Sequence, residues 1–293
     1  MTAKKSEIPS APPQVESVQP MMPPEMALAC ESAGAAKARR DWLTLLVLGM
    51  LAGAFIAFGA NFMTVVLTGA NGLPWGVGRL LAGLVFSLGL ILVIVGGAEL
   101  FTGDALMVVA YAGRKIALGD LLRAWALVYI GNIIGAIGTA ALVFLAGQHG
   151  FDKGGVGQTA LAVASAKAAL PTTQLFFLAV LCNVLVCLAV WMSFGARSAT
   201  DKVMVIVPPI AAFVAAGFEH SIANLYFLPY GLAIKAWAAP EFWAAINQSP
   251  AAYPLLTGST VAHNIAVATI GNLVGGSFMV GVIYWFVYLR KPP

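Results

Sequence analysis

The chain has 293 residues, of which 60% are hydrophobic and only 10% are charged. Soluble domains average about 45–50% apolar and about 25% charged residues, so this composition excludes an ordinary soluble protein and indicates several membrane spans. The formal net charge is +4, but the basic residues are dispersed among short polar segments, so we expect no nucleic-acid partner.

The first forty residues differ in composition from the rest of the chain. Residues 1–24 are rich in Pro, Ser and Lys and lack the apolar core of a cleavable signal peptide, which predicts a disordered cytoplasmic tail. Residues 25–40 are Ala-rich and end in basic residues. This pattern favours a helix along the cytoplasmic surface of the membrane, although an ordinary cytosolic helix would have the same features. Residues 41–293 then form the membrane domain.

Six apolar runs in this domain reach the roughly 20 residues that a membrane-crossing helix needs. They cover residues 43–68, 80–112, 121–146, 175–194, 203–239 and 261–289. The second and fifth runs are overlong because polar residues interrupt each of them. We therefore predict an all-α membrane protein with six transmembrane helices, of which the second and fifth are broken.

Lys and Arg residues predict the orientation of these spans. Twelve of the 16 lie in the N-terminal segment, the second and fourth loops and the C-terminal segment. The other four are Arg79, Lys153, Lys167 and Lys235. This asymmetry predicts that both termini are cytoplasmic.

The interruption of the fifth span reads G-F-E-H-S-I-A-N over residues 217–224, with Glu219 and His220 inside it. A charged group at the bilayer centre costs about 2.5–3.5 kcal/mol, so we expect a site here. The structural alternative is that Glu219 caps a helix end and that His220 is a neutral packing residue. The interruption of the second span over residues 99–104, E-L-F-T-G-D, favours the site, because two interrupted spans at corresponding positions are typical of transporters.

The interruption of the second span follows the pair Gly96-Gly97, which weakens the helix. Irregular backbone inside a membrane is tolerated where protein buries it or where it lines a watery cavity. We therefore expect residues 100–103 to form a loop that projects into the centre of the protein. Thr102 would offer a hydroxyl there and Leu100 and Phe101 apolar bulk, although these two residues could also simply fill the core.

A repeated motif relates the two halves of the chain. G-N-x-x-G contains Asn132 in the third span and Asn272 in the sixth. It pairs spans one to three with spans four to six as two inverted three-helix repeats, and it matches residues 99–102 with residues 219–222. We expect both asparagines, and Asn224 beside the interruption of the fifth span, to support the interrupted backbone. Small residues should lie where helices touch: Gly53, Gly59, Gly135 and Gly275.

Two further residues each fit two roles, and the cysteines fit none. Asn183 is a lone amide in the fourth span, either a packing residue or a pore-lining donor. Lys167, in the second outer loop, is either a solvated surface residue or part of an electrostatic funnel for anions. The three cysteines have no metal-ligand spacing, so we expect no metal site and no cofactor.

Several of these motifs together resemble the formate/nitrite transporter family, most closely its formate channels. They are E-L-F-T, the two G-N-x-x-G motifs, L-V-C-L-A-V-W-M-S-F-G-A-R-S-A-T-D-K and F-E-H-S-I-A-N. The resemblance covers essentially the whole chain from Pro24 to Lys291. It implies a homopentamer of aquaporin-like protomers in a bacterial cytoplasmic membrane, surrounded by lipid, each with its own pore for small monovalent anions such as formate, nitrite or hydrosulfide.

The resemblance also implies roles for particular residues. Matched position by position, the central site falls on His220 and Thr102, with Asn183 and Glu219 beside the pore and Lys167 at its outer mouth. The cytoplasmic constriction falls on Leu90, Leu100 and Val186, with Phe101 included among the constriction residues, and the periplasmic one falls on Phe86 and Phe213. The sequence departs from formate channels in reading T-G-D rather than T-S-T after Phe101 and in carrying Glu99 where Asp is frequent.

The leading hypothesis is therefore a formate channel or proton-coupled formate transporter. A small anion loses its hydration between two apolar constrictions, and a central histidine compensates by donating a hydrogen bond or a proton. A membrane enzyme is disfavoured because the spans contain no haem-type histidine pair and no nucleotide loop. A neutral-solute facilitator of the aquaporin type is a rival from a different class, although Asn-Pro-Ala boxes are missing.

Overall fold

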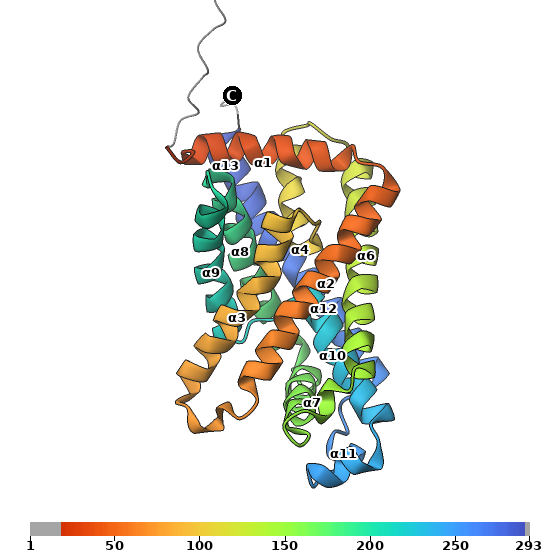
Figure 1. Ribbon diagram of the computed structural model, residues 1–293. Coiled ribbons are helices and arrows are strands. Elements are labelled where there is room, and N and C mark those ends of the chain that lie inside the picture. The colour runs from red at the N-terminus through yellow and green to blue at the C-terminus, as the bar shows by residue number, and fades with distance from the viewer. Residues whose placement is uncertain (1–18, 291–293) are drawn as a thin grey trace, which may run out of the picture.

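The computed structural model describes residues 19–290, and every regular element in this range is a helix (Figure 1). Five stretches are long and apolar enough to cross a membrane: α2 (Trp42–Leu67), α3 (Trp75–Gly96), α6 (Leu118–Leu145), α8 (Thr172–Gly195) and Gly258–Tyr288. The last stretch is continuous but changes character, from α12 (Gly258–Leu273) through a π-helix (Val274–Val282) to α13 (Ile283–Tyr288). The all-α prediction is confirmed for the described residues.

The predicted second and fifth spans are both interrupted. After α3, residues 97–100 are not helical, and the chain continues through the short elements α4 (Phe101–Asp104), η2 (Ala105–Met107) and α5 (Val108–Ala112). The fifth run is divided into α9 (Ala199–Ala215) and α10 (Ser221–Trp237), each of 17 residues. A helix of this length covers about 26 Å, less than the roughly 30 Å hydrocarbon core, so neither is among the five long stretches.

The prediction that residues 100–103 form a loop is wrong. The irregular segment ends at Leu100, and Phe101 begins a helical turn that contains Thr102. The shift has a local cause, because Gly97 at φ +81° ends α3 and the Asn132 side chain then accepts the N–H of Phe101 at 2.9 Å.

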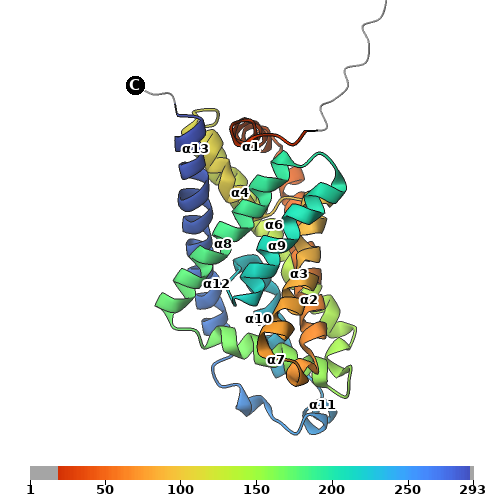
Figure 2. The ribbon, with the colours of Figure 1, turned by 90° about the vertical axis from the view of Figure 1, so that its left-hand side faces the viewer.

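The segment predicted as the second outer loop, residues 150–171, contains the helix α7 (Gly155–Ala168). This helix crosses one end of the bundle beside α11 (Pro240–Ala245) (Figure 2). Its alanine face packs directly against α10, where Gly231 leaves no room for a Cβ beside Ala164. The alanines therefore serve close helix packing, which composition alone did not separate from a loop.

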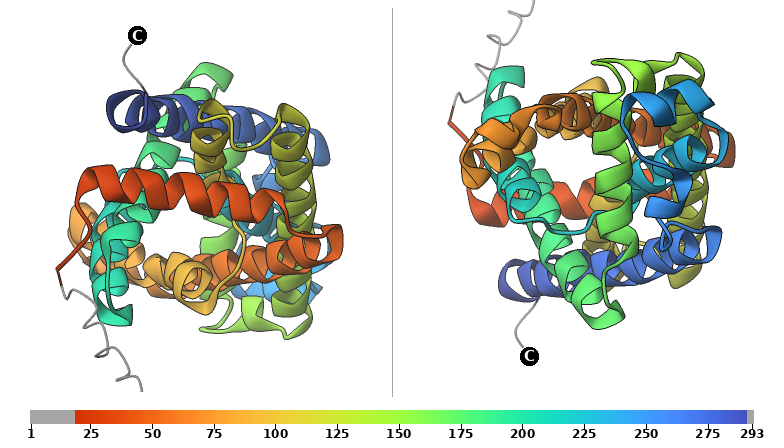
Figure 3. Two further views of the ribbon diagram at one scale, coloured as in Figure 1. Left: turned by 90° about the horizontal axis from the view of Figure 1, so that it is seen from above. Right: turned by 90° about the horizontal axis from the view of Figure 1, so that it is seen from below.

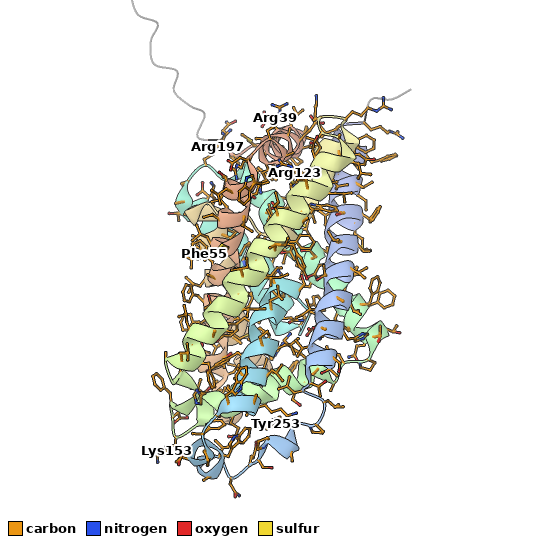
Figure 4. The ribbon with its side chains drawn as sticks, turned by 90° about the vertical axis from the view of Figure 1, so that its right-hand side faces the viewer. Arg39, Phe55, Arg123, Lys153, Arg197 and Tyr253 are labelled. Carbon is orange, nitrogen blue, oxygen red and sulfur yellow. The ribbon has the colours of Figure 1, made fainter. Side chains whose placement is uncertain are left out.

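The opposite end of the bundle is crossed by α1 (Pro23–Ala38), which lies across the ends of the other helices (Figure 3). The helix begins two residues before the predicted start at residue 25. Most of the predicted disordered tail, residues 1–18, lies outside the described residues. The labelled basic residues Arg39, Arg123 and Arg197 lie at the α1 end and Lys153 at the other end (Figure 4), in agreement with the grouping made from the sequence.

Glycines make the closest helix crossings. A Cβ at Gly53 would overlap the carbonyl of Asn132, one at Gly135 that of Met50 and one at Gly275 that of Val180. At Gly59 the nearest atom would be the carbonyl oxygen of Phe86, at 2.7 Å. All four predicted glycines therefore lie at helix contacts, where backbones approach each other directly.

Gly135→Ala should lower the free energy of unfolding by at least about 2 kcal/mol, because the new methyl group forces α2 away from α6. Gly138→Ala is the matched control on the same helix, since its Cβ would meet nothing within 4 Å, and it should be neutral or stabilising by up to about 1 kcal/mol. Thermal unfolding in detergent measures both. Equal melting temperatures for the two variants would contradict the close crossing.

Candidate functional site

The two interruptions have nearly the same backbone conformation. Each begins with a glycine at positive φ, Gly97 at +81° and Gly217 at +76°. Each ends at the residue before a helix, Leu100 at φ −108° and ψ 120° and His220 at φ −104° and ψ 114°. Glycine adopts positive φ values at little energetic cost, so both positions favour glycine. The motif pairing of residues 99–102 with 219–222 therefore corresponds to an equivalence in structure.

One asparagine holds each interruption by three hydrogen bonds. The Asn132 amide donates to the carbonyls of Glu99 at 3.0 Å and Gly49 at 2.7 Å, and its oxygen accepts from Phe101 N–H. Asn272 repeats this arrangement, since its amide donates to the carbonyls of Glu219 at 2.9 Å and Ala179 at 2.7 Å and its oxygen accepts from Ser221 N–H at 2.8 Å. All these bonds are buried, so each side chain replaces partners that the interrupted helix has lost.

The two interruptions bring His220 and Thr102 together. His220 Nε2 lies 2.9 Å from Thr102 Oγ1, and both residues are buried. His220 Nδ1 accepts the Ala223 N–H at 3.1 Å at the start of α10. An imidazole nitrogen that accepts carries no proton, so the proton of the neutral ring is on Nε2 and is donated to Thr102. The threonine hydroxyl keeps its own proton for a further acceptor.

Apolar side chains adjoin this pair. The ring of Phe213 faces that of His220 with centroids 5.9 Å apart, and Phe86 meets Phe213 edge-on at 5.6 Å. Leu90 follows Phe86 by one turn of α3 toward the α1 end. Leu90, Leu100 and Val186 are all buried.

Phe101, which was predicted beside the cytoplasmic constriction, lies in a different environment from Leu90, Leu100 and Val186. Its ring lies 4.7 Å from Tyr129 and 6.4 Å from Trp125, both on α6. This is the core-filling role that the sequence left open for Phe101.

Asn183 links the central pair to the last membrane helix. Its amide donates to the backbone carbonyls of Thr102 at 3.1 Å and Asn272 at 2.6 Å. Its Oδ1 is buried and has no partner among the described residues. The amide therefore supports the backbone, and the oxygen is a polar atom that a ligand or water would satisfy.

On the α7 side of the centre, Lys167 forms an ion pair with Glu219 at 2.8 Å. Asn224 donates to the same carboxylate at 2.7 Å and to Asn264 at 2.8 Å, and Asn264 donates to the Lys167 carbonyl at 2.9 Å. Lys167 is therefore not a solvated surface lysine. Its ammonium compensates the buried Glu219 carboxylate beside His220.

On the α1 side, Lys37 pairs with Glu99 at 2.5 Å and Asp104 at 2.6 Å, and Arg40 also pairs with Glu99. Burial by itself would lower the pKa of the Lys37 ammonium, but the Asp104 and Glu99 carboxylates outweigh that effect and raise it above its ordinary value. Lys37 and Arg40 were missed in the sequence. Acidic residues in an apolar run need a countercharge, and the basic end of the preceding helix was the signal.

A cavity of about 1210 Å³ opens at the α7 end of the bundle and leads to the centre. Its lining includes Phe86, Phe213, Glu219, His220 and Lys167. The cavity thus connects the α7 end of the bundle with the histidine. Thr102, Leu90, Leu100 and Val186 are not part of its lining.

Within residues 19–290, no three His, Cys, Asp or Glu side chains gather in an arrangement that could hold a metal ion. Cys182 and Cys187 are buried, and Cys187 Sγ lies 3.4 Å from the Thr102 carbonyl. The polar groups of the site are thus hydrogen-bond donors and paired charges.

The protein thus has several apolar helices long enough to span a membrane and two buried interruptions. A histidine and a threonine join the interruptions, and the histidine lies at the end of a cavity. This arrangement is typical of a multi-pass membrane transport protein. The family model described as "Formate/nitrite transporter" matches residues 24–286. The chain belongs to the formate/nitrite transporter family, as its motifs indicated, and it is a transport protein rather than an enzyme.

Individual relatives agree with this assignment. The formate channel FocA of Escherichia coli K12 is 41% identical over 272 residues, 92% of this chain and 95% of that protein. The formate channel BtFdhC of Bacillus thuringiensis is 32% identical over 273 residues, 92% of this chain and 96% of that one. A solved structure titled "Pentameric formate channel with formate bound" has 44% identity and a TM-score of 0.81, and it covers 85% of this chain and 98% of its own.

Asn272→Ala should destabilise the protein by several kcal/mol, since each buried polar group left unpaired costs about 1–3 kcal/mol. Asn61→Ala is the control, because Asn61 accepts a single bond from Tyr226 at 3.0 Å and its loss should cost roughly 1 kcal/mol. Thermal unfolding in detergent compares the two. A smaller loss for Asn272→Ala than for Asn61→Ala would contradict the supporting role.

Proposed function

We propose that this protein conducts small monovalent anions, formate first among them, through a pore in each protomer. The observation that carries the proposal is the buried His220 and Thr102 pair at the end of the outer cavity, with apolar side chains beside it. The formate channels among the relatives support formate as the anion.

The chemistry of the pair suits an anion that has lost its water. A bare charge in an apolar passage is costly, and the cost falls when donors point at it. The Thr102 hydroxyl is such a donor, because His220 donates to it and leaves its own proton unused, and the His220 Nε2–H becomes a second donor once it turns from Thr102 to the anion. The positive end of α10 begins directly after His220. We assign Phe86 and Phe213 to the outer constriction and Leu90, Leu100 and Val186 to the inner one, both acting by dewetting.

Proton coupling is part of the proposal. His220 carries one proton, on the Nε2 that faces Thr102, and giving it up from the neutral ring would leave an imidazolate. Transfer to a bound formate therefore requires the ring to take a second proton on Nδ1, which ends the bond from the Ala223 N–H. Nε2 then delivers its proton and the ring is neutral again. A pure hydrogen-bond role uses the same geometry without transfer, and the two roles differ in the pH dependence of uptake.

The proposed architecture has six spans, with α9 and α10 together making the fifth, in two inverted three-helix halves and an aquaporin-like protomer. Matching hydrogen bonds at the two interruptions support the repeat. Homopentamer formation is supported by the pentameric neighbour and by the many large hydrophobic side chains exposed along the outer helices. Basic residues gathered at the α1 end support cytoplasmic termini in a bacterial cytoplasmic membrane that surrounds the assembly with lipid.

Nitrite and hydrosulfide are alternative substrates within the same mechanism, because they are also small monovalent anions. The residues after Phe101 and the presence of Glu99 motivate this alternative, since both adjoin the central threonine. A neutral-solute facilitator is disfavoured by the paired charges on each side of the centre.

Replacing His220 tests the proposal directly. His220→Phe keeps comparable bulk and removes the donor, so formate uptake into proteoliposomes should fall by roughly ten- to a hundredfold, because a hydrogen bond to a charged group contributes about 1.5–3 kcal/mol. His220→Asn keeps a neutral donor but cannot pass on a proton. If coupling operates, it should lose the rise in uptake at low external pH and keep some passive flux.

Thr102→Val should give a milder form of the same defect, and glycerol uptake should stay low in all variants. Wild-type flux and pH response in His220→Phe would show that the histidine is structural and would remove the proposal.

Leu100→Ala and Phe213→Ala test the constrictions. Each shortens a buried apolar side chain, so conductance should rise or larger anions should enter while the protein remains folded. Flux of formate and of the larger anion methanesulfonate, with thermal unfolding as the control, measures this. Loss of assembly with unchanged selectivity would instead assign both residues to core packing.

A further inference from the structure

Arg79 is a half-buried cation whose position is explained neither by the sequence motifs nor by the central site. It lies near the outer end of α3 and lines the outer cavity. Its Nε donates to the carbonyl of Ala215 at 3.2 Å and its Nη2 to that of Val214 at 2.5 Å. Both acceptors belong to the last turn of α9, which directly follows Phe213.

The position of Arg79 on α3 makes these bonds a tie across the outer constriction. Arg79, Gly83 and Phe86 follow one another at spacings of four and three residues, so they share one face of the helix. Gly83 allows α3 to touch α9, since its Cβ would lie 2.5 Å from the Ala211 carbonyl oxygen. The same helix face thus carries one ring of the constriction and the guanidinium that holds the helix of the other ring, Phe213.

The segment that Arg79 holds is weakened by its own sequence. Pro208 and Pro209 lie inside α9, and because proline has no N–H, the carbonyls one turn earlier lose their helical partners. Gly217 then ends the helix cap at positive φ. The turn that contains Phe213 therefore lies between two weak points, and its orientation depends on contacts from outside α9.

The guanidinium also faces the anion's route. Within the described residues Nη1 makes no hydrogen bond, and Arg79 shares the cavity lining with Lys167 and Lys153. A guanidinium binds a carboxylate or similar oxyanion by two parallel charge-assisted bonds, which are stronger than bonds to neutral carbonyls. An anion entering the cavity thus competes with Val214 and Ala215 for the same donors.

We propose that Arg79 is the clasp of the outer constriction: its bonds to the end of α9 hold Phe213 against Phe86, and a monovalent oxyanion in the outer cavity loosens them by taking the guanidinium. The anion favours the wide state because only there can the Nε and Nη2 donors join those of Nη1 in binding it, which is the differential affinity that a population shift requires. This inference rests on the proposed function in taking a small anion as the permeant species.

Three variants separate the clasp from simpler roles. Arg79→Gln removes both the charge and the fork of donors. Arg79→Lys keeps the charge, but a single ammonium does not reproduce the two-point hold. Lys153→Asn removes one positive charge from the same cavity without touching α9, and asparagine tolerates the φ of +54° at that position.

The expected result concerns anion size and concentration in proteoliposomes. Arg79→Gln and Arg79→Lys should both raise methanesulfonate uptake relative to formate uptake by roughly tenfold, the factor that one charge-assisted hydrogen bond represents. This uptake ratio should approach that of Phe213→Ala. Formate uptake should rise more steeply than in proportion to its concentration in the wild type and in simple proportion in both variants. Lys153→Asn should match the wild type in both respects.

Two results would overturn the clasp. A lower formate rate at low salt, equal in Arg79→Gln and Lys153→Asn and with unchanged anion selectivity, would assign Arg79 to electrostatic attraction alone. A lower melting temperature in Arg79→Gln with unchanged selectivity would make the residue structural.

A measurement independent of transport keeps this test separate from that of the proposed function. Spin labels at Val77 and Ala216, both exposed, report the separation of the outer end of α3 from the end of α9. The separation should increase on adding formate to the otherwise unchanged protein and should already be large without formate in Arg79→Gln. If the wild type carries no anion, the proposed function is wrong. If the separation in Arg79→Gln without formate equals that of the wild type, the proposed role of Arg79 is wrong.

Discussion

Interrupting a helix inside a membrane leaves backbone groups without partners, and the protein must supply those partners itself. In this chain the supply comes from side-chain amides. Asn132 and Asn272 each bind two carbonyls and one N–H at their interruption. The amides allow Leu100 and His220 to stand at the starts of new helices near the centre of the protein. The central pair His220 and Thr102 depends on this arrangement, since each partner follows a different interruption.

Charge is governed by the same rule. Each interruption carries a glutamate, and each glutamate meets a lysine from an element that lies across an end of the bundle: Lys37 of α1 for Glu99 and Lys167 of α7 for Glu219. A buried carboxylate without its partner would be strongly destabilising. The end helices are therefore tied electrostatically to the segments that form the site. Their positions and the geometry of the centre are linked.

The outer constriction that we propose depends on a different kind of contact. Its two rings come from α3 and α9, and α9 is weakened by Pro208 and Pro209 before Phe213. Packing at Gly83 brings the helices together, while Arg79 orients the last turn of α9. In our proposal the permeant ion can influence this constriction, because hydrogen bonds from a cavity-lining cation hold it, whereas the proposed inner constriction is formed by aliphatic side chains.

The sequence by itself determined the class of the protein, the membrane helices, both interruptions, the pairing of Asn132 with Asn272 and the family, because these depend on apolar run length and on local motifs. It did not determine that residues 101–104 are helical or that α7 forms in the second outer loop, since hydrogen bonds and packing from distant segments decide both. Only the tertiary structure decided which residues pair with the buried charges. It also decided that Arg79 donates two hydrogen bonds to carbonyls of α9. Hydropathy and motifs report each segment's own preference, whereas an ion pair such as Lys37 with Asp104 requires residues 67 positions apart to be brought together by the fold.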